Sequence, residues 1–126
     1  MREIIETDDA PDAIGAYSQG VISESLIVTS GQIALTPEGE FLGDAPIEEQ
    51  TRQALENVDA VLRAAGSQLE EAIKVTVMLD DIEDFEAMNE VYGGFFDDEP
   101  PARSAFEVGS LPLGAAVEIE AFAPRP

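Results

Sequence analysis

The sequence has no cysteine and no histidine among its 126 residues. Without cysteine the chain forms no disulfide and offers no thiolate nucleophile, and without both residue types it lacks the usual ligands of a zinc site. A Ser-His-Asp triad is also excluded, because its general base is histidine. These absences remove thiol enzymes, Cys/His zinc proteins and serine hydrolases of the triad type from the possible functions.

Basic residues are scarce as well: the chain has 6 of them against 27 acidic residues, which gives a formal net charge of -21. A field of this sign repels the phosphate backbone of nucleic acids and anionic membrane surfaces. The N-terminal residues lack the apolar segment of a signal peptide, and no apolar run approaches the length of a membrane span. We therefore expect a cytoplasmic protein with neither a nucleic-acid nor a membrane partner.

The excess of acidic residues destabilises the fold, because like charges repel one another in the compact state. At an ionic strength of 1 M the Debye length is about 3 Å, short enough to uncouple most surface carboxylates. Only one lysine, Lys74, accompanies this surplus. We interpret the composition as that of a protein from a halophilic source; an acidic protein from an ordinary organism is the alternative.

The length and the hydrophobic fraction of 44% indicate one folded domain over residues 1–126. Apolar residues recur at spacings of three and four over residues 47–65, which predicts an amphipathic helix that ends at Gly66. A second helix is predicted at residues 85–96, capped by Asp84 or Asp81. Strands are predicted at residues 21–29, 33–35, 74–80, 104–108 and 116–123. This order predicts an α+β fold with two helices packed on one face of a mixed sheet.

Alternation in the last predicted strand assigns its residues to the two faces of the sheet. Val117 and Ile119 are expected to face the helices, which leaves Glu118, Glu120 and Phe122 on the open face. A half-apolar open face on so small a domain usually packs against another subunit. We therefore expect an oligomer.

Arg103 and Glu118 are the main candidates for chemistry. Arg103 is one of five arginines and begins a strand-like segment, and a guanidinium suits the bidentate binding of a carboxylate. Glu118 lies on a second strand-like segment and supplies a carboxylate that can take a proton from water. The structural alternative is an ion pair of Arg103 with Glu118 or Glu120 that neutralises a buried acid.

Other candidate residues also have structural alternatives. Ser30 and Asn89 are candidates for the polar lining of a site, although Asn89 also suits local capping of a helix. Tyr17, in a loop flanked by glycines, either lines a site or covers the core with its ring. Gly31 follows a strand and allows the close approach of a ligand. Lys74 lies within a predicted strand in a chain rich in acids, so we expect an ion pair rather than a Schiff base.

Several segments together are similar to one known family. Pro-Ala-Arg-Ser at residues 101–104, continued by Leu111-Pro112 and by Val-Glu-Ile at residues 117–119, resembles the signature of the RidA/YjgF family, the reactive intermediate deaminases. Residues 13–20, 29–33 and 84–89 resemble further motifs of the family in the same order, so the resemblance covers nearly the whole chain. It implies a chorismate-mutase-like α+β fold and a homotrimer whose sheets face inward, with ligand clefts between subunits.

The resemblance also implies an activity, the hydrolysis of reactive 2-imino acids and enamines such as 2-aminoacrylate to 2-oxo acids and ammonia, without a metal or organic cofactor. By this resemblance Arg103 binds the substrate carboxylate, Glu118 places or activates the attacking water, and Tyr17 lines the cleft. Backbone groups at Gly31 and Ala105 are expected to contact the ligand. Such a sparse site is sufficient in principle, because a protonated imine is already a good electrophile and needs mainly orientation and a base.

Two features depart from the family pattern. Ala105 stands where many members have cysteine, so any role of that thiol is missing from this chain. The loop at residues 97–101 is shorter and more acidic, and we expect it to alter access to the cleft.

Other functions remain as alternatives. A trimer that binds small carboxylates such as 2-oxo acids without catalysis would use Arg103 but would not need Glu118 for turnover. Ribonuclease activity or translation inhibition, which has been associated with relatives of this family, is disfavoured by the charge of -21 and by the absence of histidine.

Overall fold

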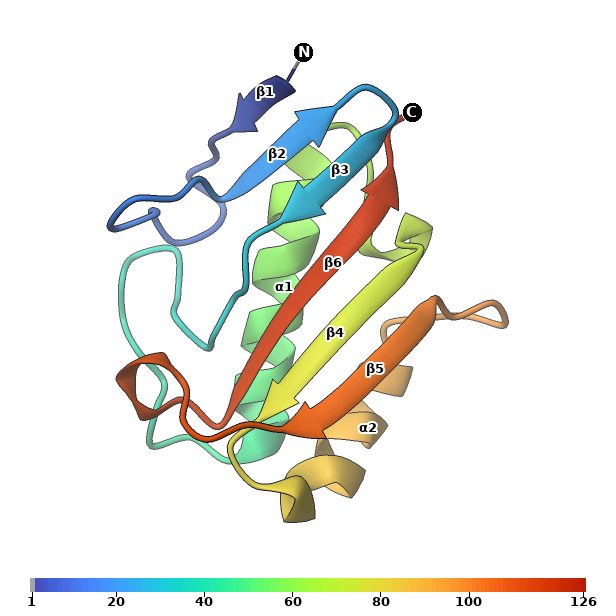
Figure 1. The fold of residues 1–126 in the computed structure, drawn as a ribbon. Coiled ribbons are helices and arrows are strands. Elements are labelled where there is room, and N and C mark those ends of the chain that lie inside the picture. The colour runs from blue at the N-terminus through green and yellow to red at the C-terminus, as the bar shows by residue number, and fades with distance from the viewer. Residues whose placement is uncertain (1) are drawn as a thin grey trace.

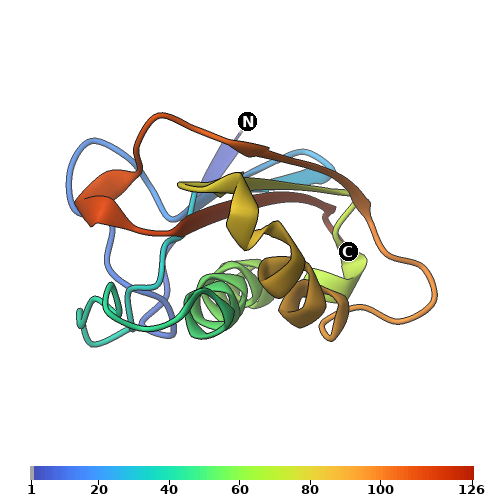
Figure 2. The ribbon, with the colours of Figure 1, turned by 90° about the horizontal axis from the view of Figure 1, so that it is seen from below.

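The computed structural model describes residues 2–126 and shows a six-stranded sheet with two helices on one face (Figure 1, Figure 2). The strands are β1 (Arg2–Ile5), β2 (Gly20–Ser23), β3 (Leu26–Thr29), β4 (Lys74–Leu79), β5 (Ala102–Glu107) and β6 (Val117–Pro124), and the helices are α1 (Ile47–Ala64) and α2 (Phe85–Gly93). In the sheet order β1-β2-β3-β6-β4-β5, β4 and β5 run parallel and the other neighbours antiparallel. The predicted two helices on a mixed sheet are confirmed. None of the helices in residues 2–126 is long and apolar enough to cross a membrane.

Helix α1 closely follows its predicted range. Its apolar stripe packs against β6 and α2, and the fully buried side chains of this stripe are Ala54, Leu55, Val58, Val61 and Leu62. Glu48 and Glu49 occupy the first turn and Arg63 the last, where their charges complement the helix dipole. Gly66 then adopts a φ of +88°, a left-handed conformation that favours glycine and ends the helix.

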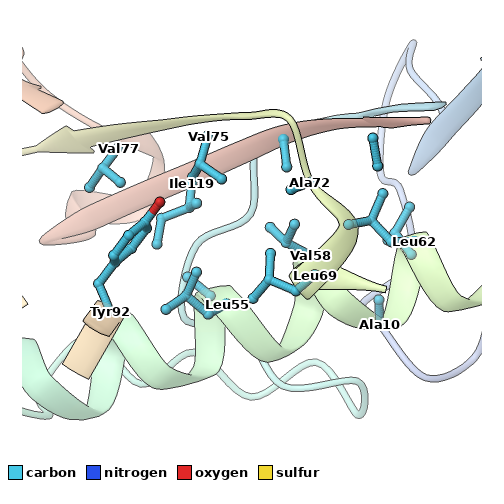
Figure 3. Close-up of a cluster of buried hydrophobic side chains, with 14 of the residues drawn as sticks. Ala10, Leu55, Val58, Leu62, Leu69, Ala72, Val75, Val77, Tyr92 and Ile119 are labelled. Atoms are coloured by element: carbon cyan, nitrogen blue, oxygen red, sulfur yellow. The ribbon is translucent and has the colours of Figure 1, made fainter. Parts of the chain in front are cut away.

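The core lies between the sheet and the helices (Figure 3). Figure 3 shows Val75 and Val77 of β4 and Ile119 of β6 facing Leu55 of α1 and Tyr92 of α2. All five side chains are buried, and burial of one such side chain stabilises a fold by about 1.5–3 kcal/mol. The core therefore fixes β4, β6 and α2, the elements that carry or flank most of the candidate residues.

The two faces of the sheet differ as predicted. Val75, Val77 and Leu79 are fully buried on the helix side, and the residues between them are half-buried on the other side. Strands β5 and β6 also lie close to their predicted ranges. On the open face one cross-strand row spans the sheet and is almost entirely apolar: Ile4, Val21, Val28, Phe122, Lys74 and Ala102. A continuous apolar row in contact with solvent is typical of a surface that packs against another chain.

Two strand predictions in the first third of the chain are wrong. Residues 21–29 form the hairpin of β2 and β3 instead of one strand, because the chain reverses at Glu24 with a left-handed φ of 53°. The reversal has no glycine or asparagine, the residues that usually mark such a turn. Residues 33–35 lie outside the strands, and this region forms only isolated bridges, one between Gln32 and Ile119 and one between Leu35 and Phe41. The short strand β1 is absent from the prediction, since its single buried residue gives no alternation.

Helix α2 is shorter than predicted. It ends early, at Gly93, which is followed by a second glycine, and glycine is a poor helix former. A single 3-10 turn at Ile82–Asp84 precedes the helix. The carboxylate of Asp81 accepts a hydrogen bond of 2.9 Å from the backbone N–H of Glu83, whereas Asp84 makes no side-chain cap. Asp81 therefore caps the 3-10 turn, and neither aspartate caps α2 through its side chain, so the predicted cap of this helix is wrong.

Lys74 forms no ion pair within residues 2–126. Its Nζ donates a hydrogen bond of 2.8 Å to the hydroxyl of Ser104 on β5. The ion pairs of the described residues involve arginine instead. The expected ion pair of Lys74 is therefore wrong for the single protomer.

Candidate functional site

Arg103 is held by side chains of helix α2. It lies on β5 beside Val75 of β4, so its side chain is on the helix side of the sheet. Its guanidinium carbon lies 4.7 Å from the centroid of the Tyr92 ring and 5.4 Å from that of Phe85. Arg103 Nη1 donates a hydrogen bond of 2.6 Å to Asn89 Oδ1. The guanidinium is thus placed over aromatic rings and hydrogen-bonded to an amide, and its other N–H groups remain for a ligand.

The spacing of the three α2 residues explains this arrangement. Phe85, Asn89 and Tyr92 are four and three residues apart, so they share one stripe of the helix. From the sequence, Asn89 is expected either to line a site or to cap a helix locally. In the structure its amide oxygen accepts the hydrogen bond from Arg103, and local capping is not the observed role.

A cavity of about 490 Å³ opens beside Arg103, between the end of α2 and the loop that leads to β5. Its lining includes Asn89, Tyr92, Phe96, Asp97, Pro100 and Pro101. Tyr92 and Phe96 form a tilted aromatic pair with ring centroids 4.8 Å apart. The volume lies in the range of roughly 300–1,000 Å³ that is usual for small-molecule sites.

The hydroxyl of Tyr92 is buried and has no hydrogen-bond partner among the described residues. Figure 3 shows the ring rising from α2 with its oxygen directed toward the sheet, near Val77 and Ile119. Burial raises the pKa of the Tyr92 phenol, and the positive charge of Arg103 opposes this rise. Tyr92 therefore contributes a neutral ring beneath the guanidinium, and its hydroxyl is buried on the side of the ring that faces the sheet (Figure 3).

Glu118 lies on β6 and faces away from the helices. It pairs with Met78 of β4 and is half-buried. Its carboxylate lies against Gly31, where an added Cβ would overlap it, so this close approach requires glycine. Burial raises the pKa of the Glu118 carboxyl, and repulsion by Glu120 raises it further. A carboxyl with a raised pKa suits proton exchange with water and substrate.

Backbone hydrogen bonds fix the segment that carries Gly31. The N–H of Gln32 donates to the carbonyl of Ile119 at 2.8 Å, and the N–H of Ile119 donates back to Gln32 at 2.9 Å. The hydroxyl of Ser30 donates to the backbone carbonyl of Ser18. Ser30 therefore ties the Glu118 neighbourhood to the loop that carries Tyr17.

That loop is anchored by a buried glutamine, Gln19, which is not among the site residues predicted from the sequence. The amide nitrogen of Gln19 donates to the carbonyls of Thr7 and Pro11 at 3.0 and 2.8 Å, and Gln19 Oε1 accepts from the N–H of Thr7 at 2.7 Å. A buried amide inside a loop leaves no periodic signal by which it can be found. Tyr17 itself is 53% exposed, so the alternative in which its ring covers the core is wrong.

Acidic side chains gather next to the Arg103 cavity. A second hollow, of about 460 Å³, is lined by Glu70, Glu71, Phe96, Asp97, Asp98 and Glu99. Asp97 thus borders both hollows, whereas Asp98 borders only this one of the two. Within residues 2–126 no group of three or more acidic side chains is placed to hold a metal ion.

Arg103 and Glu118 lie on opposite faces of the sheet. Arg103 pairs with the buried Val75 on the helix side, whereas Glu118 pairs with Met78 on the open face. Ala105 lies on the same side as Arg103 and packs against the core. The ion pair of Arg103 with a carboxylate of β6, the structural alternative in the sequence, is therefore wrong for the single protomer. A single protomer does not bring the two main candidates into one cleft.

Known proteins are similar to this chain over nearly its whole length. The sequence profile of the family described as Endoribonuclease L-PSP matches residues 7–124. The 2-iminobutanoate/2-iminopropanoate deaminase of Rattus norvegicus is 44% identical over 123 residues, which cover 98% of this chain and 90% of the rat protein. The structure of E. coli TdcF with bound serine superposes with a TM-score of 0.92 at 46% sequence identity, and the match covers 98% of this chain and 99% of the TdcF chain. The E. coli YjgF gene product is 42% identical with the same TM-score, 0.92, and the same coverage, 98% and 99%. The chain therefore belongs to the RidA/YjgF family.

Proposed function

We propose that this protein hydrolyses reactive 2-imino acids and their enamine tautomers to 2-oxo acids and ammonia. The observation that carries the proposal is the setting of Arg103, whose guanidinium lies over Tyr92, is tied to Asn89 and borders a cavity. Such a fixed guanidinium suits a small molecule with one carboxylate. The rat relative named as a 2-iminobutanoate/2-iminopropanoate deaminase supports the same reaction.

The reaction requires only a base and a group that orients the substrate. Water adds to the carbon of the protonated imine, and the resulting carbinolamine expels ammonia to leave the 2-oxo acid. Glu118 takes a proton from the attacking water and returns it to the leaving nitrogen. The raised pKa of its carboxyl favours both transfers, since the group accepts and releases the proton nearer neutral pH. Arg103 holds the substrate carboxylate and so orients the imine carbon toward the water.

We propose further that the active cleft is completed in a homotrimer. Because Arg103 and Glu118 lie on opposite faces of the sheet, a substrate that contacts both lies between Arg103 of one subunit and Glu118 of a neighbour. The apolar row on the open face offers this assembly a surface to bury when the sheets face inward. In this arrangement the cleft is lined by Tyr17, Ser30 and Gly31 with Glu118, and by Asn89 and Ala105 with Arg103.

The family description Endoribonuclease L-PSP points to a second activity, on RNA. RNA binding depends on cations that neutralise phosphates, and this chain has 6 basic residues and a net charge of -21. We therefore propose a small-molecule site, with neither a nucleic-acid nor a membrane partner.

A coupled assay in molar KCl tests the proposal. An amino-acid oxidase generates the imines of alanine and 2-aminobutyrate, and semicarbazone formation reports how fast they disappear. We expect the wild type to accelerate imine loss and Arg103→Ala to abolish the acceleration. Arg52→Ala is the matched control, because Arg52 is exposed on α1 and does not border the Arg103 cavity.

A trimer that only binds small carboxylates gives a different result. It accelerates no imine loss, yet 2-oxo acids bind in calorimetry and Arg103→Ala weakens that binding. Glu118→Ala separates binding from turnover, since in the enzyme this exchange abolishes the rate and leaves ligand affinity largely intact. Full activity of Glu118→Ala contradicts the proton-transfer role of Glu118.

A further inference from the structure

The cavity beside Arg103 has an apolar wall and an anionic corner. Tyr92, Phe96, Pro100 and Pro101 contribute rings and so present mostly carbon. Asp97 brings a carboxylate to the same cavity. The ion pairs of residues 2–126 do not include Asp97, so its carboxylate makes no direct contact with the Arg103 guanidinium.

The chemistry of a 2-imino acid places its side chain next to this cavity. The carboxylate is bonded to C2, and C2 carries both the imine nitrogen and the side chain. When Arg103 holds the carboxylate, the side chain therefore starts within a few ångströms of the guanidinium. The cavity of about 490 Å³ borders the same guanidinium and has room for a substituent much larger than methyl.

We infer that this cavity receives the side chain of the imino acid and selects apolar side chains larger than methyl over acidic ones. This inference rests on the proposed function and names its substrate class: imines derived from leucine, methionine or phenylalanine over those derived from aspartate or glutamate. The apolar wall favours the first group through burial of their carbon atoms, and the Asp97 carboxylate repels the second.

The expected size of the preference follows from burial. Each methylene removed from water is worth about 0.8 kcal/mol, which is about fourfold in kcat/KM. The leucine side chain is three carbons larger than that of alanine, so we expect a preference of at least about tenfold for its imine. For an acidic side chain the like charge of Asp97 acts against this gain.

Asp98 provides a matched control for the charge of Asp97. Both are exposed aspartates in the loop that follows α2. Asp97 borders the cavity of Arg103, whereas Asp98 borders the neighbouring hollow with Glu70 and Glu71. Asp97→Asn and Asp98→Asn change the net charge equally, so a difference between them reports the position of the charge.

The test measures kcat/KM for imines of alanine, leucine and glutamate, each generated by an oxidase of matching specificity, with wild type, Asp97→Asn and Asp98→Asn. We expect the order leucine over alanine over glutamate in the wild type. At 0.1 M KCl, where the Debye length is about 10 Å, Asp97→Asn should raise the value for the glutamate imine by about tenfold and leave that for the leucine imine within about twofold. At 1 M KCl, where the Debye length is about 3 Å, the gain for the glutamate imine should be smaller. Asp98→Asn should change neither by more than about twofold.

Other outcomes overturn the inference. Equal rates for leucine and alanine imines show that the side chain lies elsewhere. An equal gain for all three imines in Asp97→Asn shows that Asp97 competes with the substrate carboxylate for Arg103. If no imine reacts, the proposed reaction fails, and calorimetry with 4-methyl-2-oxopentanoate and 2-oxoglutarate still tests the cavity in the same three proteins. In calorimetry we expect 4-methyl-2-oxopentanoate to bind more tightly than 2-oxoglutarate, and Asp97→Asn alone to raise the affinity for 2-oxoglutarate. Equal affinities for the two ligands overturn the inference.

Discussion

The carboxylate of Glu118 lies so close to Gly31 that a single methyl group added at position 31 would overlap it. The overlap would involve the carboxylate carbon and the adjacent Cγ as well as Oε2, so the end of the Glu118 side chain occupies the space that a side chain at position 31 would need. The segment that contains Gly31 and strand β6 are held together by the reciprocal backbone hydrogen bonds between Gln32 and Ile119. Gly31 thus leaves the space that the Glu118 carboxylate occupies.

Gly31→Ala should therefore act mainly on the rate. We expect kcat to fall by about tenfold or more, because the carboxyl is displaced from the attacking water, and KM to change little, because Arg103 is untouched. The free energy of unfolding should change little, because the overlap is with the end of a flexible, half-buried side chain that can move aside. The imine assay and thermal unfolding measure the two effects. Gly109→Ala is the control, since a Cβ there meets nothing within 4 Å; an equal kcat in both variants would contradict the positioning role.

The pH dependence of activity should reveal the raised pKa of Glu118. The base form of this carboxyl is required, so kcat/KM should rise with pH through a pKa above that of an ordinary glutamate. Glu120→Gln removes the repulsion, the second cause of the shift, and should move the acid limb of the profile to lower pH. Burial, the first cause, remains, so the limb should stay above the ordinary position. An acid limb that Glu120→Gln leaves in place would show that the two carboxyls do not interact.

The same pKa shift has a consequence for stability. Because the pKa of Glu118 is higher in the folded than in the unfolded protein, the folded protein binds this proton more tightly. The stability that this proton contributes is fully present below the unfolded pKa and is lost as pH rises through the folded pKa. The Gln side chain of Glu118→Gln stays neutral, so this variant should be more stable than wild type at pH values above the folded pKa of Glu118. Urea unfolding at several pH values measures this, and a variant that is less stable at neutral pH contradicts it.

Asn89 should act on substrate binding through Arg103. Asn89→Ala removes the hydrogen bond of 2.6 Å to the guanidinium and should raise KM by about tenfold with a smaller effect on kcat, in line with about 1.5 kcal/mol for a charged hydrogen bond. Asn89→Asp places a carboxylate against the guanidinium that competes with the substrate, and should weaken binding further. Glu90→Gln, an exposed exchange at the next position of α2, serves as the control. If Asn89→Ala lowers kcat alone, Asn89 does not position Arg103 for binding.

The periodic spacing of apolar residues predicted most of the fold. The three-and-four spacing of residues 47–65 predicted α1, and the alternation at residues 74–80 predicted the buried and open faces of β4, because both patterns record which side is packed. The hairpin at Glu24 escaped prediction because a non-glycine residue takes the left-handed conformation there. The predicted arrangement of two helices on a mixed sheet is correct despite that error, since the helices and the central strands determine it.

The candidate site was only partly predictable. Arg103 and Glu118 stood out by charge and by their place in strands, but their opposite faces depend on the register of β4 with both neighbours, which no local pattern reveals. The spacing of Phe85 and Tyr92 on one stripe of α2 would by itself indicate core residues. In the structure they also lie beneath the guanidinium, a contact between residues far apart in the chain.

Exchange of Tyr92 separates the roles of its ring and its hydroxyl. Tyr92→Phe removes a buried hydroxyl that has no partner among the described residues, and such a group destabilises a fold by about 1–3 kcal/mol. We therefore expect the variant to unfold at the same or a higher temperature and to keep its activity, because the ring stays 4.7 Å from the guanidinium carbon. Tyr92→Leu loses the ring and should raise KM, since the cation–π contact that steadies Arg103 is gone. Loss of activity in Tyr92→Phe would instead assign a role to the hydroxyl itself.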